Sequence, residues 1–395
     1  MPYAVIACTI VFFWVISLRA YLFTVLPTIA ADLGLSPSAA GALIGLVSLG
    51  YCAALWSAGF LPGKCRRVIV AGMAASVIAL LGVALSPGPA ALYAAATVAG
   101  LGSGVYLPLG LAIVVGVSRP GRRSRNMSVH ELASTAGSFC GAAFVALALP
   151  LLTWREATAV WSLVGVLGCV AMLFLRTDPI VQPRLGSGPR LRLDGVLAAA
   201  IAVFATCQLI LTGLTSALPL ILVNGWGVAQ GEAAAAISWT RLAGLLGIGV
   251  VGALGDRWRP ATAVRLSFGL AALSTAAMAV LPFGLPFIVA AFILTAAGTA
   301  AVILISVVVA QAFPEELRSR SLSLTNGSAG VMGLAVLPAV FGSFVDNGLP
   351  TAPFVVATLA SVIAAALIGF LTGRQAVSSG ATVSATSGGD GGRVG

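Results

Sequence analysis

Apolar residues fill most of this chain in continuous stretches, each of about 20 residues or more, which is the length a helix needs to cross a bilayer. Short segments rich in Arg, Pro and Gly separate these stretches. Membrane β-strands would be shorter and would alternate apolar with polar residues, so the pattern predicts an all-α membrane protein. The predicted spans are residues 4–26, 39–62, 67–87, 89–117, 127–150, 155–175, 195–223, 233–254, 261–282, 285–312, 321–345 and 351–373.

Three short motifs recur about half a chain apart, at offsets between 192 and 195 residues. The matching segments are 25–27 and 217–219, 59–63 and 252–256, and 123–129 and 318–324. We therefore expect two pseudo-symmetric six-helix bundles, a parallel repeat typical of transporters. The predicted domains are residues 1–175, a cytoplasmic linker at 176–194, residues 195–373, and a tail at 374–395 whose Ser, Gly and Thr content predicts disorder.

Basic residues gather on one side of the predicted spans. Sixteen of the 21 Lys and Arg residues fall in connections on the side of the N-terminus and two more in the tail, whereas Arg155 alone falls in a connection on the other side. The positive-inside rule then places both termini in the cytoplasm, with the chain in the cell membrane. The net charge of +10 is dispersed among these short connections, which argues against nucleic acid as a partner.

Arg19 and Arg241 are the two basic residues that lie deep inside predicted spans, at similar depths. An arginine at the centre of a bilayer costs at least about 2.5 to 3.5 kcal/mol, so an intramembrane arginine is a functional candidate. Because no acid lies at a matching depth, we interpret the pair as binding an anion, which suits the planar guanidinium. The alternative is structural: each arginine bonds backbone carbonyls at a helix break, or stacks on Trp14 or Trp239.

His130 and Glu131 are candidates for proton coupling. His130 is the only histidine of the chain, and Glu131 begins a polar stripe that continues through Ser134, Thr135 and Ser138 at helical spacing. A membrane carboxylate there could titrate during transport. The alternative is that Glu131 pairs with Arg125, one to two helical turns away.

Residues 252–259, with the sequence GALGDRWR, resemble the loop motif of the major facilitator superfamily. Residues 18–36 resemble the first helix of its organic anion symporters and of its cyanate and nitroimidazole transporter branch. The resemblance implies the major facilitator fold, contact between Arg19 and an anionic substrate, and a conformational latch at Gly252, Asp256 and Arg257. It further implies that the fourth, seventh and tenth spans line a cavity, which makes Tyr106, Gln208, Thr212 and Thr299 candidate lining residues; the repeat adds Asn326.

Other parts of the chain depart from that family's patterns. Gly63 and Lys64 replace the Asp and Arg of the motif in the first half, and Ala96 stands where proton-linked antiporters carry an arginine. The fifth span also lacks the Gly-Pro signature of drug antiporters. These departures count against a typical multidrug antiporter.

The sequence thus predicts a secondary active transporter that moves a small organic anion by alternating access, with proton symport as a hypothesis. An exporter of a hydrophobic drug or secondary metabolite is the alternative. We expect no enzyme activity, catalytic residue, cofactor or metal site, because eleven scattered acids, one histidine and six cysteines form no such constellation. We expect a monomer in the lipid bilayer, with a small anionic solute and, in the symport hypothesis, protons as its partners.

Overall fold

The computed structural model describes residues 3–58, 65–118, 123–175, 195–254, 259–313 and 324–386. Within these residues, twelve helical segments are long and apolar enough to cross a membrane, as the apolar stretches predict. The elements are α1 (Tyr3–Leu33), α2 (Pro37–Ala58), α3 (Cys65–Ala84), α4 (Pro89–Gly104), α5 (Tyr106–Val117), α6 (Arg123–Ala148), α7 (Trp154–Leu173), α8 (Gly195–Gln208), η1 (Leu209–Gly213), α9 (Leu214–Leu220), η2 (Ile221–Gly225), α10 (Gln230–Leu254), α11 (Pro260–Val280), α12 (Leu285–Ala312), η3 (Val331–Val336), α14 (Leu337–Asp346) and α15 (Ala352–Thr386).

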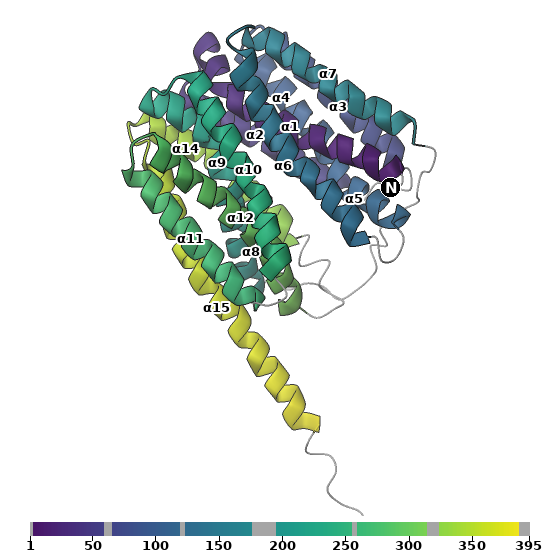
Figure 1. Ribbon diagram of the computed structural model, residues 1–395, viewed down its shortest axis with the longest axis vertical. Helices are drawn as coiled ribbons and strands as arrows, with labels where there is room; N and C mark the ends of the chain where they lie inside the picture. The colour runs from purple at the N-terminus through teal and green to yellow at the C-terminus, as the bar shows by residue number, and fades with distance from the viewer. Residues whose placement is uncertain are drawn as a thin grey trace, which may run out of the picture.

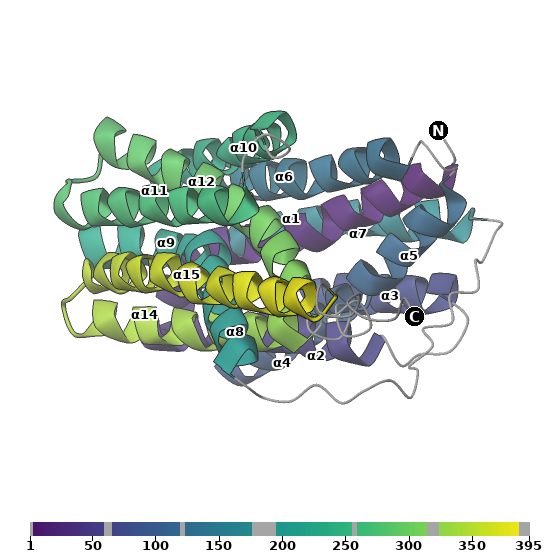
Figure 2. The same cartoon turned by 90° about the horizontal axis from the view of Figure 1, so that it is seen from below.

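Two helical bundles lie side by side, one formed by α1 to α7 and the other by the elements from α8 to α15 (Figures 1 and 2). Each bundle has its own hydrophobic core. The two meet where α1 packs against α9, α6 against α10, and α2 against η3 and α14. The linker 176–194 and the latch residues Asp256 and Arg257 lie outside the described residues, and Gly252 lies in the last turn of α10.

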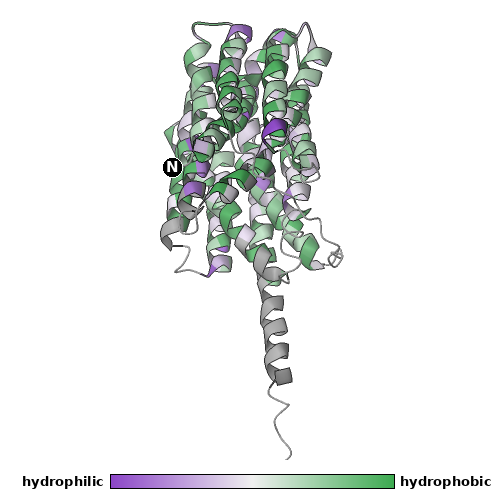
Figure 3. Ribbon diagram, turned by 90° about the vertical axis from the view of Figure 1, so that its right-hand side faces the viewer, coloured by the Kyte–Doolittle hydropathy of each residue, from purple (hydrophilic) through white to green (hydrophobic). Residues whose placement is uncertain are grey.

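Hydrophobic residues cover the outer helices along most of their length (Figure 3). Leu151, Val280 and Leu85 are 83%, 81% and 79% exposed, fractions that would be costly in water for so many apolar side chains. In a bilayer the same residues contact acyl chains, while the helices satisfy their own backbone hydrogen bonds. The surface is therefore that of a multi-pass membrane protein.

Glycines allow the two bundles to approach each other closely. A β-carbon on Gly41 or Gly45 of α2 would collide with the backbone carbonyls of Pro338 and Ala335, and one on Gly342 would collide with that of Pro37. Small residues at such positions let helix backbones pack tightly in membranes. The α2 contact with η3 and α14 is thus a backbone-to-backbone interface.

We call the two ends of the molecule the Tyr3 end and the Asp32 end, after the first and last turns of α1. At the Asp32 end, the Ser38 N–H donates to Asp346 Oδ2 at 2.9 Å, and Gln230 Nε2 donates to the Thr24 carbonyl at 2.6 Å. Both hydrogen bonds join the bundles. Among the described residues no comparable packing joins α5 or α12, which run to the Tyr3 end, to the opposite bundle.

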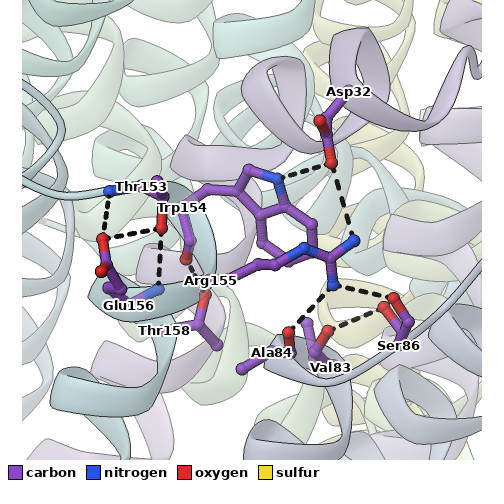
Figure 4. Close-up of polar contacts among 9 residues, drawn as sticks. All are labelled: Asp32, Val83, Ala84, Ser86, Thr153, Trp154, Arg155, Glu156 and Thr158. Atoms are coloured by element: carbon purple, nitrogen blue, oxygen red, sulfur yellow. Dashed lines mark hydrogen bonds and ion pairs between the residues drawn. The ribbon is translucent and has the colours of Figure 1, made fainter.

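Arg155 ties three segments of the first bundle together at the Asp32 end (Figure 4). Its Nη1 donates to the carbonyls of Ala84 and Ser86 at 3.0 and 2.8 Å, which caps the end of α3. Its Nη2 lies 3.6 Å from Asp32 Oδ2, the atom that also accepts a hydrogen bond from Trp154 Nε1 at 3.0 Å. Arg155, the one basic residue predicted in a connection on this side, therefore has a structural role at the start of α7.

The tail predicted as disordered from residue 374 is helical as far as Thr386, because α15 continues beyond its membrane span (Figure 1). Helix propagation costs little once a long helix is formed, since each added residue gains one hydrogen bond. The segment up to Thr386 also contains no proline. The structure thus places residues 374–386 in α15, residues 387–395 lie outside the described residues, and disorder of the tail stays a prediction.

Candidate functional site

A cavity of about 470 Å³ lies between the two bundles, with walls formed by α1, α6, η1, α9, α10 and α12. Arg19 and Arg241 both line it, each contributed by a different bundle. The stripe predicted on α6, from Glu131 through Ser138, lines it as well. The sequence therefore identified the three charged residues of the described cavity wall.

Arg19 is held on the cavity face of α1, with Ile16, Ala20 and Phe23 at helical spacing around it. It is 8% exposed, and its Nε and Nη2 atoms are buried with no hydrogen-bond partner. The guanidinium carbon lies 4.6 Å from the ring centre of Tyr51 and 5.8 Å from that of Phe23, within the range of cation–π attraction. In the described part of the chain no carboxylate forms an ion pair with it.

Arg241 is anchored to Thr215 of α9, one helical turn before Pro219. Its Nη1 donates to Thr215 Oγ1 at 3.0 Å and its Nη2 to the Thr215 carbonyl at 3.1 Å. That carbonyl lacks its usual helical donor, because the residue four positions on is Pro219, which has no N–H. Arg241 thus meets the structural alternative in part, although its Nε is buried without a partner and the side chain still lines the cavity.

Close packing of α6 on α1 brings the polar stripe to the cavity. A β-carbon on Gly137 or Gly141 would collide with the carbonyls of Phe13 and Ser17 on α1, so these glycines set the short distance between the two helices. Glu131 is 45% exposed and lines the cavity. Its predicted alternative partner, Arg125, has a side chain outside the described part of the structure.

His130 and Tyr106 lie behind the cavity wall, and both are fully buried. The His130 ring stacks on Phe12 with 4.4 Å between ring centres and an interplanar angle of 6°. Its Nε2 lies 2.8 Å from Tyr106 Oη, and Tyr106 Oη donates to the Cys8 carbonyl at 2.6 Å. Its Nδ1 is 3.5 Å from Glu131 Oε1 without hydrogen-bond geometry. Tyr106, predicted to bind substrate, is therefore separated from the cavity and contacts His130.

Gln208 and Asn326, also predicted to bind substrate, do not line the cavity either. Gln208 Nε2 donates to Asn326 Oδ1 at 3.4 Å, which joins α8 to the helical segment 324–330 within the second bundle. Thr212 Oγ1 donates to Gln208 Oε1 at 3.3 Å, and Thr212 itself lines the cavity. This exposed pair lies outside the cavity lining and reaches it only through Thr212.

The remaining lining combines hydroxyl groups with apolar side chains. Ser134, Ser138 and Ser216 make no hydrogen bond within the described part of the chain, so their hydroxyls are available to a ligand. The apolar lining residues include Ile16, Phe23, Leu211, Ile248, Val302 and Ile303. Two guanidinium groups, one carboxylate, free hydroxyls and an apolar surface suit an amphipathic molecule with a negative group.

The sequence did not identify Tyr51 and Thr215, which hold the two arginines. Tyr51 lies on α2 with Ser48 as its one polar neighbour three or four residues away, which does not mark it as a partner of Arg19; its role depends on how α2 packs on α1. Thr215 did carry a signal, because it stands four residues before Pro219 and so owns a carbonyl that the proline leaves without a donor.

Residues 5–334 match the family model of the Major Facilitator Superfamily. A cephamycin export protein of Amycolatopsis lactamdurans is 28% identical over 236 residues, which is 59% of this chain and 46% of that protein. The chain thus aligns with less than half the length of this relative.

Solved structures of similar fold are transporters. A bacterial homologue of the human lysosomal transporter Spinster, in an inward-facing and occupied conformation, has a TM-score of 0.74 at 16% identity, covering 94% of this chain and 96% of that one. A nucleoside transporter has a TM-score of 0.74 at 15% identity, covering 93% and 99%. At 15% and 16% identity, the likeness to these solved structures shows the fold alone. The match to the family model, over residues 5–334, covers most of the chain. The chain belongs to the Major Facilitator Superfamily and is a membrane transporter.

Proposed function

We propose that this transporter moves an amphipathic organic anion across the cell membrane by alternating access, with the anionic group held between Arg19 and Arg241. The observation that carries the proposal is the state of Arg19, which is 8% exposed with two unpartnered nitrogen atoms beside the cavity. Keeping a buried guanidinium without a carboxylate partner is costly. An anionic substrate would supply the missing hydrogen bonds and charge.

Arg241 supports the same conclusion from the opposite bundle. Its two bonds to Thr215 fix the guanidinium in place while leaving Nε free, which is the arrangement expected of a pre-organised binding group. Because the two arginines come from different bundles, an anion between them would also offset their mutual repulsion. The substrate would therefore draw the two bundles together.

Export of a secondary metabolite is the second candidate, because the aligned relative is named as a cephamycin exporter. The apolar part of the cavity lining is compatible with such a molecule. The two candidates are compatible when the metabolite is itself an acid. We further propose that the Tyr3 end faces the cytoplasm, following the distribution of basic residues.

Ligand-dependent thermal stability of the purified protein tests the proposal, since a ligand that binds only the folded state raises the melting temperature. The probes are benzoate, a β-lactam carboxylate, neutral benzamide and the lipophilic cation tetraphenylphosphonium. We expect stabilisation by the carboxylates and none by benzamide. Stabilisation by the cation instead would favour a drug exporter and contradict the anion site.

Variants then connect binding to the arginines. Arg19→Gln and Arg241→Gln should each abolish carboxylate stabilisation and counterflow in vesicles. Arg265→Gln removes an exposed charge on α11 outside the cavity and should change neither. Unaltered carboxylate binding in folded Arg19→Gln protein would overturn the proposal.

A further inference from the structure

The hydrogen bonds behind the cavity wall have only one consistent direction. Tyr106 has a single hydroxyl proton, and the Cys8 backbone carbonyl, 2.6 Å away, can only accept. If Tyr106 donated to His130 instead, two oxygen lone pairs would face each other at this short distance. The hydroxyl therefore donates to Cys8, and His130 Nε2, at 2.8 Å, must carry a proton and donate to Tyr106.

The direction of these hydrogen bonds determines whether the other ring nitrogen of His130, Nδ1, carries a proton. A neutral imidazole carries one proton, so Nε2–H leaves Nδ1 with a lone pair. Nδ1 is buried without a hydrogen-bond partner, and Oε1 of the Glu131 carboxylate lies 3.5 Å from it. These two acceptor atoms have no proton between them. A proton on Nδ1 makes the ring a cation beside the carboxylate, and the two opposite charges attract each other at this distance.

We propose that His130 Nδ1 and the Glu131 carboxylate share one transported proton, that Tyr106 positions the imidazole to receive it, and that this proton binds together with the anion held by Arg19 and Arg241. The inference rests on the proposed function for its anion and deepens it by naming the proton site. Glu131 is 45% exposed and lines the cavity, so it connects the buried Nδ1 to the substrate space. The proton comes from the cavity and returns to it.

The charges around the pair give the sign of the coupling. Among the side chains that the structure describes, the ionisable groups around the pair are Cys8 and Arg19 on α1, Tyr51 on α2, Tyr106 on α5 and Arg241 on α10. The thiol and the phenols are neutral when protonated, so Arg19 and Arg241 are the fixed charges among these described groups. One added proton makes the cavity more positive by one unit and favours an anion. By linkage, a bound anion must favour the proton equally.

The single histidine of this chain makes the site directly observable. Protein labelled with ¹⁵N-histidine and purified without a histidine tag gives one imidazole spectrum. We expect the neutral ring as the Nε2–H tautomer, with Nδ1 gaining a proton on acidification. Benzoate should raise the pH midpoint of that step by about one unit, equivalent to about tenfold coupling. A neutral ring in the Nδ1–H tautomer would overturn the proton site.

Matched phenol variants test the positioning residue. Tyr106→Phe removes the acceptor of Nε2–H, so the neutral ring should shift toward the Nδ1–H form that can donate to Glu131. Tyr21→Phe removes another fully buried hydroxyl, one bonded to Thr158 on the far side of α1, and should leave the tautomer unchanged. Equal behaviour of the two variants would overturn the role of Tyr106.

The experiment separates the two proposals. Benzoate that stabilises the protein without moving the midpoint overturns the coupling and leaves the anion site intact. Failure of every carboxylate to bind overturns the proposed function and the coupling with it, while the tautomer still decides the proton site. In Glu131→Gln protein we expect the pH dependence of benzoate binding to disappear.

Discussion

Pro219 affects the cavity because it has no backbone N–H to donate to the Thr215 carbonyl. Without its N–H, the Thr215 carbonyl is free, and Arg241 takes it together with the Thr215 hydroxyl. These two hydrogen bonds from Arg241 to one residue fix the plane of the guanidinium. Arg19 is held differently, on the ring of Tyr51 and without polar partners. Arg241 is thus positioned by hydrogen bonds within the protein, whereas Arg19 has nitrogen atoms without hydrogen-bond partners.

Replacing Thr215 with valine tests this pre-positioning, because valine keeps the shape and removes the hydroxyl. Loss of one hydrogen bond to a charged group costs about 1.5 kcal/mol, so we expect the Kd of a carboxylate to rise about tenfold. Thr206→Val is the control, since the Thr206 hydroxyl bonds only its own helix and lies outside the cavity. Titration calorimetry measures both. Tighter binding in Thr215→Val would mean that Thr215 competes with the substrate instead of positioning Arg241.

Among the helices, the seventh membrane segment departs most from its sequence prediction. The apolar stretch 195–223 predicts one continuous helix, whereas the structure has α8 and α9 separated by the π-helical turn η1 and followed by η2. Such turns are common at functional sites. Here η1 supplies Leu211 and Thr212 to the cavity. Local sequence cannot predict a π turn, because its wider turn is stabilised by packing against η3, a contact distant in the chain.

The difference between local sequence and contacts distant in the chain also explains which site residues the sequence could identify. Arg19, Arg241 and Glu131 stand out because charge inside an apolar stretch is costly wherever the helix turns. Tyr106, Gln208 and Asn326 could not be placed, because helices that are apolar on every side give no sign of which face meets the cavity. Their surroundings are set by Cys8, His130 and each other.

The interface between α2 and η3 is also an element-scale property, and Gly45 tests it. Gly45→Ala places a methyl group against the Ala335 carbonyl, so the bundles must separate at a cost of about 1 to 3 kcal/mol. We expect a lower melting temperature and slower transport. Gly269→Ala on α11 meets no atom within 4 Å and should keep or raise the melting temperature, since alanine is the better helix former. Equal melting temperatures would show that the bundles tolerate a wider gap.

At the scale of the whole molecule, the cavity lies between two bundles that are tied at one end. Ser38 with Asp346 and Gln230 with Thr24 join them at the Asp32 end. At the Tyr3 end, α5 and α12 lack comparable packing across the interface in the described residues. A carrier that rocks about a central site must break the first set of contacts to release its substrate on that side.

A reversible cross-link at the Asp32 end tests this requirement. The hydrogen bond between Ser38 N and Asp346 Oδ2, 2.9 Å long, makes these two residues neighbours across the interface. The double variant Ser38→Cys and Asp346→Cys, built without the native cysteines, places a thiol on each bundle for cross-linking by oxidation. Oxidation should abolish transport in vesicles, and reduction should restore it. Carboxylate binding should survive oxidation, because the cavity and its two arginines lie away from the cross-link. Each single-cysteine variant should transport under both conditions. Undiminished transport by fully cross-linked protein would mean that the bundles need not separate at this end, which contradicts alternating access through it.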